Sequence, residues 1–156
     1  MDCKERLEEY FRENDVPFEV QEHRAAFTAQ RVAASEHVPG RLFAKVVMAE
    51  EDGDLVMLVL PANSVVDTHK ASTVVGGNPV RLAAEREFAP RFPDCEAGAM
   101  PPFGNLYDVP VYVDRGLGTS ERIVFQAGTH TVTMSVPYAD FERLVHPTLA
   151  DLAVTR

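Results

Sequence analysis

Two strongly apolar runs joined by an acidic turn limit the fold of this chain more than any other feature. The runs are Leu42–Ala49 and Leu55–Leu60, and the turn between them contains Asp52-Gly53. Asp-Gly between two such runs is the strongest short-range signal for a β-hairpin. Because both runs are apolar along nearly their whole length, we expect the two strands to lie centrally in a sheet that is covered on both faces.

The rest of the chain mixes helical and extended patterns without a regular strand-helix-strand rhythm. Apolar residues three or four apart predict helices, and β-branched runs between Gly or Pro turns predict strands. The expected helices are Lys4–Asn14, Thr28–His37, Ser64–Ser72, Ala83–Phe92 and Tyr138–Val145. The expected further strands are Phe18–His23, Val109–Asp114, Ile123–Ala127 and Thr131–Val136. This arrangement predicts a single α/β domain of the mixed α+β kind over residues 1–156.

The composition is that of an ordinary globular protein with an acidic balance. Hydrophobic residues make up 46% and charged residues 25% of the 156 residues, and the formal net charge is −9. Nucleic-acid binders usually show clustered Lys and Arg, so this charge argues against DNA binding and against tight nonspecific RNA binding. It leaves open a brief contact with one end of a tRNA. The longest apolar run, Leu55–Ala62, is too short to span a bilayer, and the charged first residues are not a secretion signal, so we expect a soluble cytoplasmic protein.

The cysteines and histidines do not have the spacing of a metal centre. Cys3 and Cys95 lie far apart and form no CxxC motif, which favours two unpaired structural thiols in a reducing compartment. The five histidines form no HxxxH or similar pair, so we expect no metal. The sequence has no GxSxG elbow, GxGxxG or P-loop, and hence no evident nucleophile for covalent catalysis. A water molecule or a substrate hydroxyl would have to attack.

Lys45 is the first candidate for a functional residue. It is the only charged residue in the predicted strand Leu42–Ala49, where it shares a face with Phe43 and Val47. One interpretation is an edge-strand lysine that guards against aggregation. The other is a lysine that points into a polar cavity, because a buried ammonium is costly unless it is paired.

A loop rich in glycine and proline is the second candidate. Glycines permit close approach of the backbone to a ligand, and prolines fix the loop conformation. Such a loop can offer backbone N–H groups as an oxyanion hole, and the alternative is a surface turn. His130 follows Gly128-Thr129 at the start of a strand and could reach a cleft. The loop is Gly98-Ala99-Met100-Pro101-Pro102-Phe103-Gly104.

Several motifs follow one another in the order and spacing of a known family. In chain order they are His23 before Phe27-Thr28-Ala29, Phe43-Ala44-Lys45, Leu58–Ala62 before Val65-Val66-Asp67, the Gly98–Gly104 loop, Val109–Asp114 and Gly128. Over roughly Val16 to Leu144 the chain resembles the YbaK-like aminoacyl-tRNA editing family. That family includes the editing domain inserted in bacterial prolyl-tRNA synthetases and several freestanding deacylases.

The resemblance implies a mixed, β-barrel-like sheet flanked by helices, with a pocket for the aminoacyl-adenosine end of tRNA. It implies that Lys45 and His130 are catalytic, with Lys45 stabilising negative charge and His130 orienting a water or the substrate's amino group. It implies no metal or other cofactor. The implied substrate-binding residues are Gly98, Ala99, Met100, Pro101, Pro102, Phe103, Gly104, Gly128, Thr129 and His23.

On this resemblance the protein hydrolyses, in trans, the ester of a small amino acid wrongly attached to tRNA. Ala, Ser or Cys on proline tRNA are the expected substrates. The expected partners are the acceptor end of aminoacyl-tRNA, met transiently, and an aminoacyl-tRNA synthetase, with no membrane and no DNA. The alternative is a non-catalytic module of the same fold that binds tRNA or protein beside a synthetase. A hydrolase of small acyl esters is a third interpretation.

Overall fold

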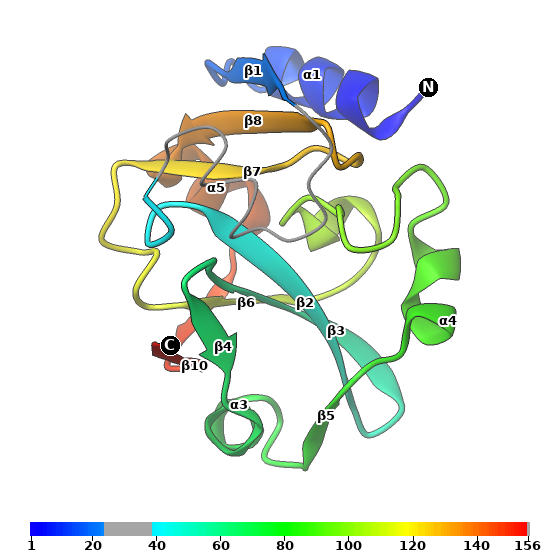
Figure 1. Cartoon of the computed structure of the whole chain (residues 1–156), viewed down its shortest axis with the longest axis vertical. Helices are drawn as coiled ribbons and strands as arrows, with labels where there is room; N and C mark the ends of the chain where they lie inside the picture. Colours follow the sequence, from blue (N-terminus) through cyan, green and yellow to red (C-terminus); the bar gives the residue numbers. More distant parts are fainter. Residues whose placement is uncertain (24–38, 156) are drawn as a thin grey trace.

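The computed structural model describes residues 1–23 and 39–155 as a mixed α+β fold (Figure 1). The predicted helix Thr28–His37 and the motif Phe27-Thr28-Ala29 lie outside the described residues. Among the helices of the described residues, none is both long and apolar enough to cross a membrane. The helices are α1 (Cys3–Glu13), α3 (Thr68–Val74), α4 (Glu85–Phe88) and α5 (Tyr138–Val145), with the 3₁₀ turns η1 (Ala89–Arg91) and η2 (Gly104–Leu106). The strands are β1 (Glu19–Glu22), β2 (Ala44–Glu51), β3 (Asp54–Pro61), β4 (Ser64–Val66), β5 (Val80–Leu82), β6 (Val111–Asp114), β7 (Arg122–Gln126), β8 (Val132–Pro137), β9 (Thr148–Ala150) and β10 (Ala153–Thr155).

The predicted hairpin is confirmed, and it lies inside the largest sheet. β2 and β3 pair antiparallel along their whole length. The turn residues Asp52 and Gly53 both have positive φ, at 50° and 85°, which is the type I′ geometry whose twist matches that of the strands. The order of the sheet is β5-β2-β3-β6-β9, so both hairpin strands have neighbours on each side.

A second sheet, of order β1-β8-β7, lies against the start of β2 (Figure 1). Its strands are antiparallel, whereas β3 with β6 and β6 with β9 are parallel. A parallel bridge between Phe43, just before β2, and Val124 of β7 joins the two sheets. The strands therefore form the mixed, barrel-like arrangement that the sequence predicted.

Two predicted helices are shorter than expected. Residues 64–66 form β4 instead of helix, and they pair with β10 at the far end of the chain. Asp67 then caps α3 by accepting hydrogen bonds from the N–H groups of His69 and Lys70. Within Ala83–Phe92 only Glu85–Phe88 is α-helical, because Pro90 has no N–H to continue the helical hydrogen bonds. The short strands β5, β9 and β10 were not predicted.

A cluster of four phenylalanines forms the centre of the core. Phe103 lies between the other three, with ring centroids 5.3 Å from Phe11 of α1, 5.3 Å from Phe125 of β7 and 5.5 Å from Phe141 of α5. All four side chains are fully buried. Rings at these separations attract one another beyond the area they bury. The cluster therefore fixes α1, α5 and the Gly98–Gly104 loop against β7.

Candidate functional site

Lys45 lies on an interior strand, and its ammonium is held beyond the end of β3. Nζ donates a hydrogen bond of 2.5 Å to the carbonyl of Ser64. Ser64 is itself buried, and its hydroxyl donates to the carbonyl of Pro61 at 2.7 Å. On the side of β2 away from β3, β5 pairs only with Ala49–Glu51, and the bridge to β7 is made by Phe43. Lys45 lies between these two contacts, so its edge-strand interpretation stays a prediction. A half-buried lysine with a fixed head group is also suited to hold a negative charge in a defined place.

The two loops singled out from the sequence are in direct contact. The N–H of Gly128 donates to the carbonyl of Ala99 at 2.9 Å, and the N–H of Glu96 donates to the carbonyl of Gly128 at 2.8 Å. His130 is buried, with Nε2 3.0 Å from the carbonyl of Ala97. A carbonyl only accepts hydrogen bonds, so Nε2 carries the proton. In a neutral His130, therefore, only Nδ1 could take up a proton.

Most of the glycine-proline loop is packed inward. Gly98 is exposed, whereas Ala99–Gly104 are buried, so a surface turn describes Gly98 alone. The N–H of Gly98 donates to the sulfur of Met100 at 3.3 Å, and the N–H of Ala99 donates to the carbonyl of Glu96 at 3.0 Å. Pro101 and Pro102 have no N–H. Within Gly98–Pro102, the N–H of Met100 is thus the group left to serve as an oxyanion donor.

Glycine is required at two positions where these loops meet. Gly98 and Gly128 have φ of +84° and +94°, in the region that side chains disfavour. A Cβ on Gly98 would meet His130 Cε1 at 3.6 Å, which is an ordinary contact. A Cβ on Gly128 would lie 2.4 Å from Cβ of Cys3, which is too close. Gly128 therefore allows the loop to pack directly on the first turn of α1.

The other two predicted substrate-binding residues lie on either side of Thr131. His23 is half-buried just after β1, and its N–H donates to the carbonyl of Thr131 at 2.9 Å. The hydroxyls of Thr129 and Thr131 are 3.2 Å apart. The structure therefore brings His23, Thr129 and His130 to the same end of β8.

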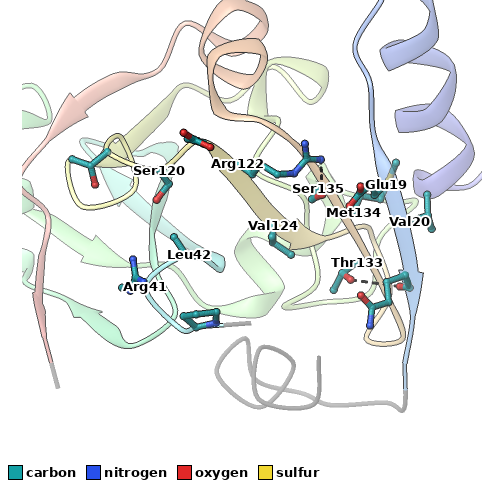
Figure 2. Close-up of a pocket in the computed structure, with 14 residues that line it drawn as sticks. Glu19, Val20, Arg41, Leu42, Ser120, Arg122, Val124, Thr133, Met134 and Ser135 are labelled. Carbon is teal, nitrogen blue, oxygen red and sulfur yellow. Dashed lines mark hydrogen bonds between the residues drawn. The ribbon is translucent and has the colours of Figure 1, made fainter. Parts of the chain in front are cut away.

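A pocket of about 910 Å³ opens beside these residues, and the sequence did not predict its lining (Figure 2). Its floor comes from the three-stranded sheet, and its rim from the segments before β2 and before β7. None of the predicted site residues is among its described lining residues. The lining is Glu19, Val20, Gln21, Pro39, Arg41, Leu42, Thr119, Ser120, Glu121, Arg122, Val124, Thr133, Met134 and Ser135.

The register of the strands relates the pocket to Lys45. Ile123 and Phe125 of β7 are buried in the core, so alternation turns Val124 and Gln126 to the opposite face, where the pocket lies. Val124 bridges Phe43 in parallel. This isolated bridge places the start of β2, and so Lys45 two residues later, next to β7. On the other side of β7, Gln126 pairs with Thr133 of the pocket lining.

Gln126 is a candidate that reasoning from sequence missed. It is 6% exposed, and its Nε2 has no hydrogen-bond partner among the described residues. A buried donor without a partner costs about 1–3 kcal/mol, so its retention points to a ligand. The period-2 pattern of Arg122, Val124 and Gln126 against apolar neighbours could have indicated a polar face.

Two arginines and two glutamates, Glu19 and Glu121, line the pocket, and the arginines are the groups that can bind an anion. Arg41 and Arg122 are both exposed, and Arg122 Nη2 donates to the hydroxyl of Ser135 at 2.8 Å. In Figure 2 they lie on different elements on either side of Val124. Guanidinium groups bind phosphate through paired N–H donors. The rim can therefore receive an anionic group while the polar floor receives a neutral one.

Both cysteines are free thiols, as expected, but the structure brings them together, which the sequence did not predict. The thiols of Cys3 and Cys95 and a carboxylate oxygen of Asp94 all lie within 4.8 Å of one another. No other group of three such side chains occurs within residues 1–23 and 39–155. This cluster lies under the start of α1 and shares no residue with the pocket lining.

Comparison with protein-family models gives a match over most of the chain. The family model described as "Aminoacyl-tRNA editing domain" matches residues 23–144. No match was found among curated proteins.

Three solved structures share the fold at low sequence identity. One, described as a candidate trans-editing enzyme for prolyl-tRNA synthetase, has a TM-score of 0.84 and 19% identity over 99% of this chain and 98% of its own. A hypothetical protein has a TM-score of 0.84 and 18% identity over 95% and 99%. A structure from work on grafting epitopes onto scaffold proteins by computational design has a TM-score of 0.83 and 20% identity over 97% of each chain.

Proposed function

The chain belongs to the aminoacyl-tRNA editing domain family, and from this premise we propose that it is an aminoacyl-tRNA deacylase acting in trans. The bond broken is the ester between a wrongly attached small amino acid and the terminal ribose of tRNA. We propose Ala, Ser or Cys on proline tRNA as the substrates. A solved structure of the same fold is described as a candidate trans-editing enzyme for prolyl-tRNA synthetase, which supports the choice of proline tRNA.

The position of Lys45 is the observation that carries this proposal. Its ammonium is fixed by the carbonyl of Ser64, and it lies one strand from a pocket of about 910 Å³. Sites for small ligands commonly occupy roughly 300–1,000 Å³, so the pocket has room for an aminoacyl-adenosine. In this arrangement the ester carbonyl lies beside Lys45 and the ribose and its phosphate extend toward the rim.

The proposed reaction needs no group beyond these side chains and water. The oxygen of a water molecule attacks the ester carbonyl carbon, and Lys45 stabilises the oxyanion that forms. The carbon–oxygen bond to the ribose then breaks, the ribose oxygen leaves with a proton, and free amino acid and tRNA are released. The neighbouring ribose hydroxyl would accept the proton of the attacking water, and His130 would hold the loops beside the site. No step uses a metal, so EDTA is expected to leave the rate unchanged.

The charges of the protein favour binding of one end of a tRNA and oppose binding of the whole tRNA. Arg41 and Arg122 at the rim would bind the phosphate that precedes the terminal ribose. The net charge of −9 would repel the rest of the polyanion, so binding is expected to be transient and to weaken with salt. Gln126, which pairs with Thr133 of the lining, would donate its amide N–H to the substrate. We propose that selection against larger amino acids is steric, since one methylene is worth about 1–3 kcal/mol in such a pocket.

The test is deacylation of proline tRNA charged with Ala, Ser, Cys or Pro, using the wild-type chain and Lys45→Met. We expect selective hydrolysis of one or more small esters, and a loss of about 100-fold or more in Lys45→Met, as when one oxyanion donor is removed. Lys4→Met is the matched control, because Lys4 is also half-buried, and on α1 it forms an ion pair with Glu8 at 4.0 Å.

Each result of this experiment decides a different point. Full activity in Lys45→Met would refute the catalytic role of the lysine. No hydrolysis of any ester by the wild-type chain, even beside a synthetase, would refute the enzyme and favour the non-catalytic module. Equal hydrolysis of free aminoacyl-adenosine, with no competition by tRNA, would favour a hydrolase of small esters.

A further inference from the structure

Two cysteines that are 92 positions apart in the sequence meet beneath the start of α1. The sulfurs of Cys3 and Cys95 lie within 4.8 Å of each other and of a carboxylate oxygen of Asp94. Tyr107 joins the group, with its hydroxyl 3.4 Å from the sulfur of Cys95, 3.7 Å from that of Cys3 and 3.1 Å from Asp94 Oδ2. These are the only two cysteines in the chain. Neither takes part in the proposed deacylation.

The neighbouring groups shift the pKa values of the two thiols in opposite directions. Hydrogen bonding from Cys95, followed by Tyr107 and the charge of Arg6, lowers the pKa of Cys3 against the opposing effect of burial. The pKa of Cys95 is raised, first by its hydrogen bond with Cys3 and then by burial. Arg6 holds the group from outside, lying 3.8 Å from Asp94 and 4.7 Å above the ring of Tyr107. Cys3 is therefore the more acidic of the two thiols.

The two thiols also differ in their exposure to solvent. Cys3 is 2% exposed, whereas Cys95 is half-buried and reaches the surface. A small oxidant can therefore reach the sulfur of Cys95 first, with a second sulfur already in place behind it. A disulfide needs a sulfur–sulfur distance of about 2.05 Å, so the sulfurs must approach by about 2.8 Å at most. Rotation about χ1 of the two cysteines moves a sulfur over that range.

We propose that Cys3 and Cys95 form a reversible redox site, oxidised by a peroxide to an intramolecular disulfide. Cys95 gives its thiol proton to Asp94 Oδ1, 3.7 Å away, and its sulfur attacks one oxygen of hydrogen peroxide. The O–O bond breaks, a sulfenic acid forms, and the departing hydroxide takes the proton from Asp94 and leaves as water. The sulfur of Cys3 then displaces hydroxide from the sulfenic acid, and the hydroxide leaves as a second water. Two thiols and one peroxide thus give one disulfide and two waters. A dithiol reductant reverses the change.

The disulfide would act on both loops of the candidate site. Cys95 comes two residues before Ala97, whose carbonyl is 3.0 Å from Nε2 of His130. Gly128 packs directly on Cys3. Drawing Cys95 toward α1 therefore pulls the Ala97 carbonyl away from His130. On the proposed function, and only on it, this predicts a several-fold loss of deacylation that dithiothreitol restores.

The experiment treats the whole chain with hydrogen peroxide in EDTA and measures the intact mass and the free thiols after unfolding. We expect a loss of 2 Da, two thiols removed, a monomeric product and full reversal by dithiothreitol. The melting temperature of the oxidised chain is expected to rise by about 5 °C or more, because the bridge closes a long loop. Cys95→Ser and Cys3→Ser are expected to show no loss of 2 Da, and Cys95→Ser keeps the buried Cys3 in case the other variant does not fold.

The proposal is overturned if the thiols survive, if the mass rises by 16 or 32 Da without a disulfide, or if the disulfide joins two chains. The mass measurement does not depend on any enzymatic activity, so it stands even if the proposed deacylase function fails. Deacylation that is lost equally in oxidised wild type and oxidised Cys95→Ser would refute the coupling to the site alone.

Discussion

Replacing Gln126 by Met would test whether the buried amide is kept for a ligand. Nε2 is buried without a partner among the described residues, at a cost of about 1–3 kcal/mol. Methionine has a similar length and no N–H, and repacking an isosteric apolar side chain costs less than about 1.5 kcal/mol. The free energy of unfolding is therefore expected to rise by about 1 kcal/mol, which corresponds to roughly 2–4 °C in melting temperature at this chain length.

The same substitution is expected to lower activity. One neutral hydrogen bond is worth about 0.5–1.5 kcal/mol, so kcat/KM for the small aminoacyl ester should fall by roughly tenfold or somewhat less. Urea denaturation measures the first effect and single-turnover deacylation the second. Ser135→Ala, which alters another polar residue on the pocket side of the sheet, is the control for the stability measurement. It removes the acceptor of the Arg122 hydrogen bond and should lower stability by up to about 1 kcal/mol.

The reasoning about Gln126 fails if Gln126→Met lowers the free energy of unfolding by 1 kcal/mol or more. That result would mean that the amide has a stabilising partner within the protein. A gain in stability with full deacylation would instead mean that the amide does not contact the substrate.

Three further predictions concern other parts of the molecule. His130→Ala should lower kcat/KM at least several-fold. His130→Gln keeps an N–H donor, so it should retain activity if the histidine only positions the loop. If both variants lose activity and the pH–rate profile changes, the histidine transfers a proton. Gly128→Ala should reduce the free energy of unfolding by about 2–5 kcal/mol in urea denaturation, because a crowded Cβ adds to left-handed strain. Gly53→Ala is the control, because Gly53 has a similar φ and nothing lies within 4 Å of the added Cβ. It should lose only about 1–2 kcal/mol of unfolding free energy. Equal losses in the two variants would contradict the role of the contact with Cys3. Arg81 holds the pKa of Glu87 down to about 2 from 4.5, so its stabilising effect is present above about pH 4.5 and is lost as the pH falls toward 2. Glu87→Gln should therefore flatten that part of a stability–pH curve, and an unchanged curve would refute the ion pair.

Local patterns in the sequence determined the elements whose signals are complete within a few residues. The Asp52-Gly53 turn between two apolar runs specified a hairpin, because only a turn with positive φ joins twisted strands so tightly. The amphipathic pattern at the start of the chain predicted α1 to within one residue at each end. Family membership was equally accessible, because motif order along the chain is itself a sequence property.

Elements that depend on a distant partner were not accessible in this way. Residues 64–66 read as the start of a helix, yet they form β4 because β10, almost 90 residues later, supplies their hydrogen bonds. A short segment is stable as a strand only where another strand meets it, and no local pattern says where that occurs.

The same division holds for the candidate site. Residue types and motif order identified Lys45, His130 and the glycine-proline loop as candidates. Only the tertiary structure buried Gln126 next to Thr133 of the pocket lining, and brought Cys95 to the first turn of α1. Burial, a missing hydrogen-bond partner and the distance between two sulfurs are properties of contacts between segments. These properties depend on the tertiary fold. Local sequence patterns could therefore identify residue types at these positions, but could not predict which residues they contact.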